Sequence, residues 1–233
     1  MGFTHVQMRA FDRTLLPEAP DLTFEQALWK KGISIVAGID EAGRGALAGP
    51  VAAAAVILPP EGKLMEYLKG VRDSKQMTPE QREVGREKIL NYAITWGVGL
   101  ATSEEIDKIG ILPATRLAAW RAIQSLNIAP SHILIDYLLL PEVHTPQTAL
   151  VKGDCRSLSI AAASILAKTS RDAILRELEC TYPGYGFARH KGYGTRAHRE
   201  AIGRLGACPA HRLSFTLLGD LGSLVSESDQ QVE

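Results

Sequence analysis

The sequence has few cysteines and no long apolar run. Its three cysteines, Cys155, Cys180 and Cys208, lie far apart and form no Cys-x-x-Cys pair, which argues against a disulfide framework and against a zinc site. No apolar stretch approaches the ~20 residues that a membrane helix needs. The first thirty residues also contain no continuous apolar segment of the signal-peptide kind. We therefore expect a cytoplasmic protein.

The formal net charge is zero, since 26 Lys and Arg balance 26 Asp and Glu. The charges are nevertheless unevenly placed. Residues 151–212 carry 11 basic and 5 acidic side chains, a net charge of +6 that the rest of the chain offsets. A basic segment of this kind suits a protein that binds phosphates, because such binding depends on local charge rather than on the total. A solvated basic surface without a partner is the simpler alternative.

Length and composition indicate one globular catalytic domain with short extensions. The chain has 233 residues, of which 45% are hydrophobic and 22% charged, and single α/β domains commonly reach about 250 residues. Apolar runs predict strands at 33–39, 51–58, 92–101, 132–135 and 149–151, the first two of them antiparallel. Helices are predicted at 79–91, after a capping box at Thr78, and then near 103 and at 113–127, 157–180 and 196–205, whereas 181–195 has no regular pattern. This order of elements predicts an α/β domain with a mixed sheet.

Four acidic residues lie at or near the ends of predicted strands. Asp40 and Glu41 come directly after the first strand, Asp136 ends the strand at 132–135, and Asp154 lies between a short strand and a helix. Neighbouring residues of a regular strand point to opposite faces, so we expect the strand to end or bulge where Asp40 and Glu41 share a site. A strand-end turn and, for Asp154, a helix N-cap are the alternatives without a chemical role.

If these four carboxylates converge, they form a metal site made of oxygen ligands alone. Such ligands suit Mg²⁺ or Mn²⁺ and disfavour zinc. Two such ions ~3.5–4 Å apart can stabilise the attacking and the leaving oxygen at a phosphodiester, which predicts a nuclease or a strand transferase. Beside the first two acids, Gly43, Arg44 and Gly45 offer backbone N–H groups and a cation that fit a phosphate or a sugar hydroxyl. A glycine turn with a surface arginine is the plainer interpretation of that triplet.

Several motifs along residues 36–215 resemble, in order, those of type 2 ribonuclease H (ribonuclease HII). They are Gly38-Ile39-Asp40-Glu41-Ala42-Gly43-Arg44-Gly45 with Gly49-Pro50-Val51, then Asp73-Ser74-Lys75, Lys152-Gly153-Asp154 with residues 159–168, Tyr185-Gly186-Phe187, residues 190–195, and His211-Arg212-Leu213-Ser214-Phe215. Each motif taken singly would be a hypothesis. Their number and order make the resemblance specific.

The resemblance implies a ribonuclease H-like α/β fold, in which helices flank a mixed five-stranded sheet and a helical cap lies at the C-terminal end. The corresponding domains are an N-terminal leader at 1–32, a catalytic domain at 33–215 that includes the cap, and a C-terminal tail at 216–233. The implied activity is that of a metal-dependent endoribonuclease. It hydrolyses the RNA strand of RNA/DNA hybrids and incises duplex DNA on the 5′ side of single ribonucleotides by two-metal-ion catalysis, leaving 3′-hydroxyl and 5′-phosphate ends.

The resemblance also implies roles for individual residues. The catalytic and metal-binding residues are Asp40, Glu41, Asp136 and Asp154, with Mg²⁺ or Mn²⁺ as cofactor. Gly43, Arg44 and Gly45 match the loop that senses the ribose 2′-hydroxyl, and Tyr193 matches a tyrosine that stacks on the following deoxyribose. Contacts to backbone phosphates are implied for Ser74, Lys75, Lys168 and Lys191. One departure is the bulky Tyr137 after the third acid, where the family often has a small residue.

The expected partners are an RNA/DNA hybrid and a ribonucleotide-containing DNA duplex, bound by a monomer without any membrane contact. The sequence leaves open whether a sliding clamp binds the chain and which of the two ions is preferred. Three rivals remain. The sister type 3 enzyme usually carries an extra N-terminal domain and a lysine in place of Arg44, a non-catalytic hybrid-binding module has no use for four acids, and a strand transferase needs no ribose sensor.

Overall fold

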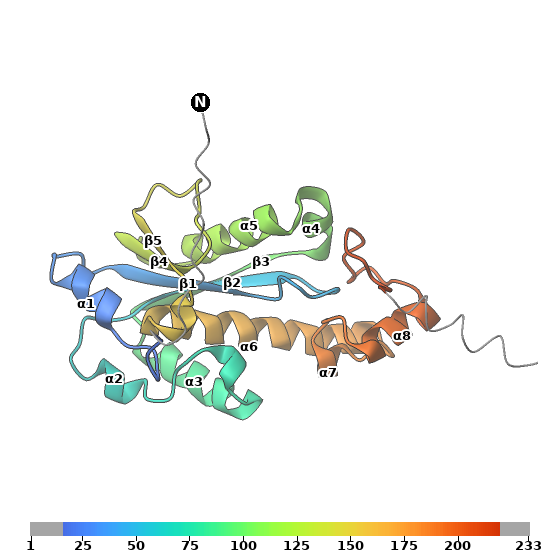
Figure 1. Cartoon of the computed structure of the whole chain (residues 1–233), viewed down its shortest axis with the longest axis horizontal. Coiled ribbons are helices and arrows are strands. Elements are labelled where there is room, and N and C mark those ends of the chain that lie inside the picture. Colours follow the sequence, from blue (N-terminus) through green and yellow to red (C-terminus); the bar gives the residue numbers. More distant parts are fainter. Residues whose placement is uncertain (1–15, 220–233) are drawn as a thin grey trace, which may run out of the picture.

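The computed structural model describes residues 16–219, which are built in layers around one sheet (Figure 1). The strand order is β3-β2-β1-β4-β5, and the strands are β1 (Val36–Ala42), β2 (Val51–Ile57), β3 (Thr95–Ala101), β4 (His132–Asp136) and β5 (Gln147–Leu150). β1, β2 and β3 pair antiparallel, whereas β4 and β5 continue the sheet from β1 in parallel. The predicted mixed five-stranded sheet is confirmed.

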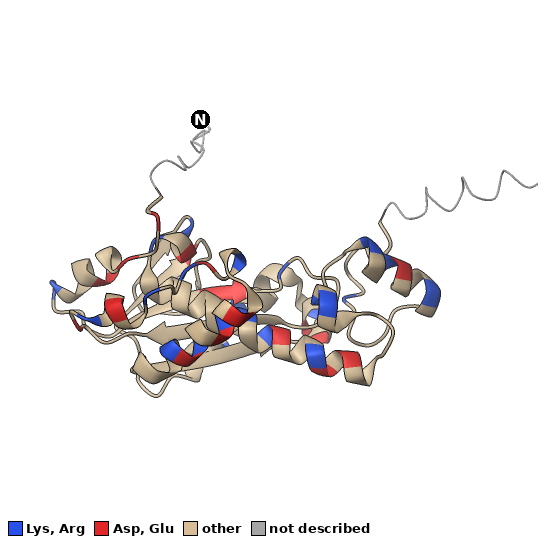
Figure 2. Ribbon diagram, turned by 90° about the horizontal axis from the view of Figure 1, so that it is seen from below, with Lys and Arg blue, Asp and Glu red and all other residues tan. Residues whose placement is uncertain are grey.

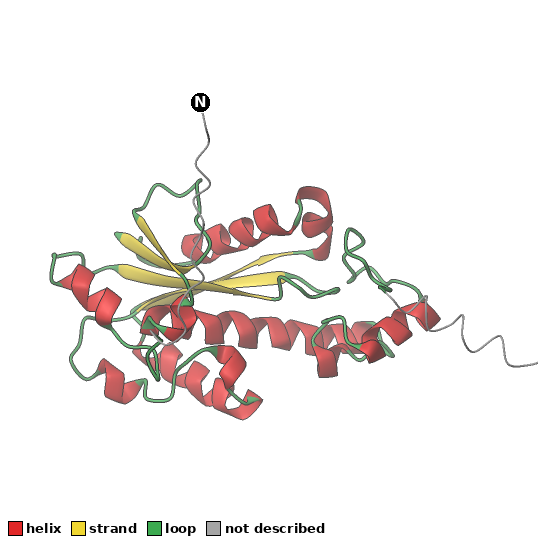
Figure 3. Cartoon of the chain, viewed as in Figure 1, coloured by secondary structure: helices red, strands yellow, loops and turns green. Residues whose placement is uncertain are grey.

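Helices cover both faces of this sheet, as Figure 3 shows. α6 (Leu158–Thr181) packs on β1 and β2 and is backed by α3 (Pro79–Tyr92). α5 (Ile111–Gln124) covers β2 and β3 on the other face, next to α4 (Ser103–Ile109). Small residues bring α6 very close to β1, because a Cβ added at Gly38 would lie 2.2 Å from the backbone of Ser159. The two faces of the sheet thus bury two separate apolar clusters.

Local sequence signals predicted several helix boundaries correctly. α3 begins after Thr78, whose side chain accepts from the backbone N–H of Gln81 while the side chain of Gln81 accepts from the N–H of Thr78. This reciprocal pair is the predicted capping box, which satisfies two backbone donors that the helix itself cannot. α8 (Arg196–Leu205) has the predicted bounds.

Other boundaries differ from the sequence predictions. β3 begins at Thr95 rather than at 92, because α3 continues through Tyr92. The segment at 181–195 contains a one-turn helix, α7 (Phe187–His190), and another short helix that the sequence did not predict is α2 (Leu64–Tyr67). Elements of a single turn have too few residues for a periodic pattern to be visible.

The described part of the predicted leader packs against the start of α6. Its helix α1 (Thr23–Trp29) carries Glu25, whose side chain is 1% exposed. The Oε1 atom of Glu25 accepts hydrogen bonds from Ser157 Oγ and from the N and Oγ of Ser159 at the start of α6. Burial raises the pKa of Glu25, and these hydrogen bonds oppose that effect. Residues 1–15 of the leader and 220–233 of the tail lie outside the described residues.

The helical C-terminal part lies beyond one end of the sheet, where α7 and α8 follow the long helix α6 (Figure 1). A third apolar cluster joins it to Leu47 and Ala48 of the loop between β1 and β2. α6 carries residues of both signs, whereas the charged residues of α7 and α8 are basic except for Glu200. Basic and acidic residues are thus interspersed on the ribbon (Figure 2), so the net charge of residues 151–212 does not form one uniform patch. None of the described helices is long and apolar enough to cross a membrane.

Candidate active site

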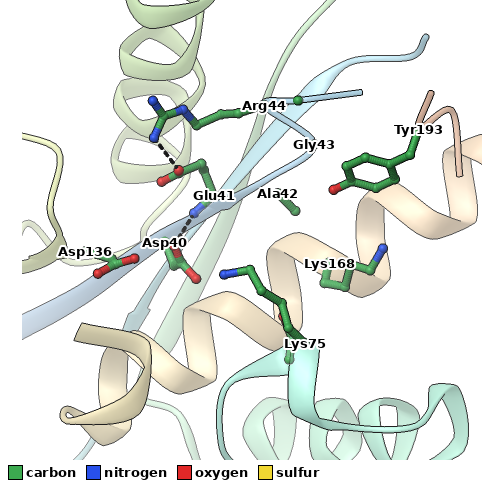
Figure 4. Close-up of a pocket in the computed structure, with 11 residues that line it drawn as sticks. Asp40, Glu41, Ala42, Gly43, Arg44, Lys75, Asp136, Lys168 and Tyr193 are labelled. Atoms are coloured by element: carbon green, nitrogen blue, oxygen red, sulfur yellow. Dashed lines mark hydrogen bonds and ion pairs between the residues drawn. The ribbon is translucent and has the colours of Figure 1, made fainter. Parts of the chain in front are cut away.

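A pocket of about 620 Å³ opens where β1 and β4 end. Eleven residues line it: Asp40, Glu41, Ala42, Gly43, Arg44, Gly45, Ser74, Lys75, Asp136, Lys168 and Tyr193. They come from β1 and the loop after it, the short 3-10 helix η2 (Ser74–Gln76), β4, α6 and the segment after α7. The pocket thus joins three of the four predicted acids to most of the predicted substrate-binding residues (Figure 4).

Asp40 and Glu41 share the pocket although β1 neither ends nor bulges there. β1 pairs with β2 regularly through Ala42, but its pairing with β4 stops at Ile39. The expectation of a strand end or bulge was wrong, because one edge of β1 is already open beyond Ile39. The two carboxylates leave opposite sides of the strand (Figure 4), and the open edge makes both accessible from one pocket.

Hydrogen bonds fix the first two acids. The Oδ1 atom of Asp40 accepts from the N–H of Glu41 at 2.8 Å, and the Oε1 atom of Glu41 lies 3.2 Å from Nη1 of Arg44. Asp40 is only 3% exposed. The orientation of Glu41 is therefore tied to the arginine of the glycine loop, the name used below for Gly43, Arg44 and Gly45.

Asp136 and Asp154 complete the acidic group from the neighbouring strand and the start of α6. Asp136 is the last residue of β4, and its Oδ1 accepts from the N–H of Gly153 at 2.8 Å. Asp154 lies in the 3-10 helix η3 (Gly153–Cys155), and the N-cap of α6 is Ser157. The alternative that Asp154 merely caps a helix is thereby wrong.

The four carboxylates lie close enough to repel one another. Burial raises the pKa of Asp40 well above its usual value, and the negative charges of the other three acids raise it further, while Lys75 opposes them. Burial also raises the pKa of Asp136 to about 6, with further contributions from Asp154 and Glu41 that the hydrogen bond from Gly153 counteracts. Bound cations would relieve this repulsion.

The donor set fits a hard divalent cation. Asp40 Oδ2 and Asp154 Oδ1 are buried without a hydrogen-bond partner, and a buried carboxylate oxygen is costly to leave unpaired. All four acids offer oxygen, which suits Mg²⁺ or Mn²⁺. Asp154 also lies near Asp73 and Cys155, their ligand atoms being within 4.8 Å of one another. Burial raises the pKa of the Cys155 thiol to about 11, and sulfur is a poor ligand for a hard cation such as Mg²⁺.

Lys75 is a second cation in contact with the acids. Its Nζ lies 3.3 Å from Oδ2 of Asp154. Burial disfavours its charged form, but the carboxylates of Asp154, Asp40 and Asp73 outweigh that effect and raise the pKa of Lys75. The side chain is 72% exposed, so the ammonium group can also reach a phosphate in the pocket.

Two of the other predicted phosphate contacts line the pocket, and one does not. Ser74 is buried, and its Oγ accepts from Ser164 Oγ at 2.7 Å. Lys168 pairs with Asp172 at 2.8 Å and lies 5.6 Å from the ring centroid of Tyr193. Lys191 is absent from the lining, and its ammonium group donates to the carbonyl of Ala188.

Tyr193 is held in place through its backbone. Its N–H donates to the carbonyl of His190, and its carbonyl accepts from Nδ1 of His198 at 3.0 Å. His198 is fully buried and stacks on the ring of His190 with centroids 4.2 Å apart. Burial lowers the pKa of His198 to about 4, so this imidazole is neutral when it supports Tyr193. Tyr137, in contrast, is 64% exposed with φ of 58° and does not line the pocket.

Sequence reasoning missed two buried arginines behind the glycine loop, Arg171 and Arg212, each 0% exposed. Arg171 donates to the carbonyls of Pro50, Lys191 and Ala48 at 2.8, 2.8 and 2.9 Å. The only signal in the sequence was the position of Arg171 on a helix otherwise rich in small and apolar residues, where a charge is rarely tolerated without partners.

Comparisons with known proteins agree with this geometry. A family model described as Ribonuclease HII matches residues 37–218. The chain is similar to the Ribonuclease HII of Dehalococcoides mccartyi, with 50% identity over 206 residues that cover 88% of this chain and 97% of the relative. It is 52% identical to the Ribonuclease HII of Synechococcus sp. over 202 residues, which cover 87% of this chain and 90% of that one.

Solved structures share the fold. Ribonuclease H2 from Pyrococcus horikoshii OT3 matches with a TM-score of 0.67 and 27% identity, covering 82% of this chain and 99% of that chain. Bst-RNase HIII in complex with Mn²⁺ matches with a TM-score of 0.64 and 18% identity, over 86% and 74% of the two chains. The RNase HII of Archaeoglobus fulgidus, solved in a complex with PCNA, has a TM-score of 0.64 and 23% identity, over 78% and 95%. The last two likenesses establish the ribonuclease H-like fold alone.

Proposed function

The chain belongs to the ribonuclease HII family, and from this premise we propose that it incises duplex DNA on the 5′ side of a single embedded ribonucleotide. The family establishes the broader activity, that of a metal-dependent endoribonuclease acting on RNA/DNA hybrids. The finer proposal concerns the junction between one ribonucleotide and the DNA that follows it. The products would carry 3′-hydroxyl and 5′-phosphate ends.

One observation carries this proposal: three of the four acids, the glycine loop and Tyr193 all face the same pocket. A group that recognises the 2′-hydroxyl must lie near the groups that cleave the adjacent phosphodiester. Gly45 is open enough for close approach, since a Cβ added there would meet no atom within 4 Å. The 2′-hydroxyl is what distinguishes RNA from DNA at a given position.

Asp40, Glu41, Asp136 and Asp154 are the residues that would hold two divalent ions. When bound, such ions supply Lewis-acid stabilisation of the attacking and the leaving oxygen of the phosphodiester. The unpartnered oxygens of Asp40 and Asp154 support this assignment. The hydrogen bond from Gly153 holds Asp136, so this carboxylate needs little rearrangement to accept a ligand.

The remaining residues bind and orient the substrate. The backbone of the glycine loop would contact the 2′-hydroxyl, and the ring of Tyr193 would stack on the next deoxyribose. Lys75, Lys168 and Ser74 would contact phosphates from within the pocket, since charged donors form strong hydrogen bonds to phosphate. The same role for Lys191 requires its ammonium group to leave the carbonyl of Ala188.

The test offers the purified protein with Mg²⁺ or Mn²⁺ three labelled duplexes: DNA with one ribonucleotide, all-DNA, and a long RNA/DNA hybrid, with EDTA as control. We expect metal-dependent incision 5′ of the single ribonucleotide and no cleavage of the all-DNA duplex. Asp40→Asn should abolish cleavage while the fold is retained. Cleavage of the long hybrid alone would indicate type 3 behaviour. Binding without cleavage would mean that the four acids do not form a working metal site.

A sliding clamp is a second proposed partner, suggested by the complex in which the Archaeoglobus fulgidus protein was solved. The direct measurement is co-elution of the full chain with a purified clamp in size-exclusion chromatography. The chain is also run alone as the control, and its elution volume tests the expectation that it is a monomer. Independent elution of the two proteins at micromolar concentration would contradict the contact.

A further inference from the structure

Arg212 is a fully buried arginine whose guanidinium group forms no salt bridge among the described residues, although the carboxylate of Asp107 interacts with its charge. Its Nε and Nη2 atoms donate to the carbonyl of Gly49 at 3.0 and 2.9 Å, and its Nη1 donates to the carbonyl of Arg44 at 2.8 Å. Burying a guanidinium group without a directly paired carboxylate costs several kcal/mol in general. Its hydrogen bonds all go to the loop between β1 and β2, so the geometry of that loop is what this residue stabilises.

The contact with Arg44 determines the orientation of one peptide group in the glycine loop. A trans peptide is planar, and its C=O and N–H bonds point in opposite directions. Because the carbonyl of Arg44 points inward to Arg212, the N–H of Gly45 in the same peptide points away from Arg212. Gly45 lines the pocket, and its N–H has no hydrogen-bond partner within residues 16–219.

The backbone of Arg212 strengthens the same link, since its N–H donates to the carbonyl of Leu47 at 2.9 Å. The guanidinium group also lies 5.3 Å from the ring centroid of Phe215, which limits its movement. Arg212 neither lines the pocket nor contacts any of the four acids. A change at this position should therefore affect recognition of the sugar and leave metal binding intact.

We propose that Arg212 is a positioning residue for sugar recognition: by holding the carbonyl of Arg44 inward, it directs the N–H of Gly45 into the pocket, where this N–H donates to the ribose 2′-oxygen. The inference rests on the proposed function, since it names the donor that would distinguish a ribonucleotide from a deoxyribonucleotide. It assigns a role in specificity to a residue that does not touch the substrate.

The test compares binding of two duplexes, identical except that one contains a single ribonucleotide, in Ca²⁺, whose coordination preferences differ from those of Mg²⁺. The measured quantity is the dissociation constant of the all-DNA duplex divided by that of the duplex with the ribonucleotide, so a high ratio means strong discrimination. Arg212→Lys keeps the charge but cannot reach both carbonyls with the fixed fork of a guanidinium group. We expect this ratio to fall about tenfold, the effect of one hydrogen bond, with unchanged affinity for Mn²⁺ by calorimetry.

Arg121→Lys is the matched control, because Arg121 also donates to a backbone carbonyl, that of Leu100, but lies on α5 away from the pocket. It should leave the ratio unchanged. If Arg212→Lys does not fold, as judged by circular dichroism, Arg212→Gln provides a second variant. Gly45→Pro removes the proposed N–H donor and should lower the ratio as Arg212→Lys does.

Combining the variants tests the mechanism itself. In the Gly45→Pro background, Arg212→Lys should cause no further loss of discrimination, since both changes remove the same hydrogen bond. Equal ratios for wild type and a folded Arg212→Lys would overturn the inference, and so would additive effects of the two changes. A wild-type protein that does not discriminate between the duplexes would instead contradict the proposed function.

Discussion

Replacing Asp136 by Asn should stabilise the metal-free protein at the same time as it abolishes cleavage. Asp136 is half-buried at the end of β4 near Asp154 and Glu41, and this environment raises its pKa from 3.8 to about 6. Above that pH the folded protein must keep a charge that its surroundings disfavour. Asn removes the charge, and its side-chain oxygen can still accept the hydrogen bond from Gly153 that Asp136 accepts at 2.8 Å.

The magnitude follows from the shift of the pKa. Moving a pKa from 3.8 to about 6 corresponds to ~3 kcal/mol at ~1.36 kcal/mol per unit. Partial exposure and coupling to the other acids reduce the gain to ~1–3 kcal/mol, or a rise in Tm of ~3–10 °C for a domain of this size. The folded state keeps the proton of Asp136 up to about pH 6, whereas the unfolded state loses it near 3.8. The wild type therefore loses stability as the pH rises through that window, and Asp136→Asn does not.

The assay is thermal unfolding of both proteins in EDTA at pH 8 and at pH 4. At pH 8 the variant should unfold at the higher temperature, and at pH 4 the difference should disappear. Added Mn²⁺ should stabilise the wild type more than the variant, which lacks a ligand. A variant that is less stable than wild type in EDTA at pH 8 would refute the electrostatic reasoning, whatever its activity.

Three further predictions concern the surroundings of the site. In Gly43→Ala, the alanine must adopt φ of +90° and its Cβ would lie 2.0 Å from Nε of Arg171. The free energy of unfolding, measured in urea, should therefore fall by ~2–4 kcal/mol, and incision should be reduced. Gly45→Ala, where the added Cβ meets no atom within 4 Å, should not alter stability. Glu25→Ala leaves buried donors at the start of α6 unpaired, so it should lower the free energy of unfolding by ~2–3 kcal/mol. An unchanged midpoint of urea unfolding would contradict this prediction. Burial lowers the pKa of His198 from 6.5 to about 4, so as the pH drops this histidine is protonated in the unfolded state before it is protonated in the folded state. The stability of the wild type should therefore fall between pH 6.5 and pH 4. The fall should be smaller in His198→Phe.

The sequence was sufficient to predict the elements with strong local signals. The capping box at Thr78 placed the start of α3, and the apolar run before Asp40 placed β1. The position of Asp136 at the end of a strand and of Asp154 shortly before a helix could also be predicted, since Asp136 ends β4 and Asp154 lies in η3 just before α6. These features depend on residues close together in the chain, where propensity and pattern are informative.

What could not be predicted depends on contacts between distant residues. The pairing of β1 with β4 stops at Ile39, and only this explains how Asp40 and Glu41 share a pocket without a bulge. The partners of Arg212 are carbonyls of residues 44 and 49, which no local pattern identifies. Backbone carbonyls are present in every residue, so the sequence contains no sign of which ones a buried arginine will bind.

Acidic side chains and buried arginines thus lie close together at the end of β1 and in the loop that follows it. Asp40 and Glu41 belong to the acidic group, and Gly43, directly after Ala42, lies against Arg171 so closely that no side chain fits between them. The acids repel one another, which lowers the stability of the fold in the absence of ligands, whereas the buried arginines donate to backbone carbonyls and form no direct salt bridge among the described residues. Cations would offset this repulsion, and in the proposed function the glycine loop and Lys75 would contact the sugar and phosphates of a bound duplex. Such a site lowers the stability of the free protein, but its groups are already oriented before the substrate arrives.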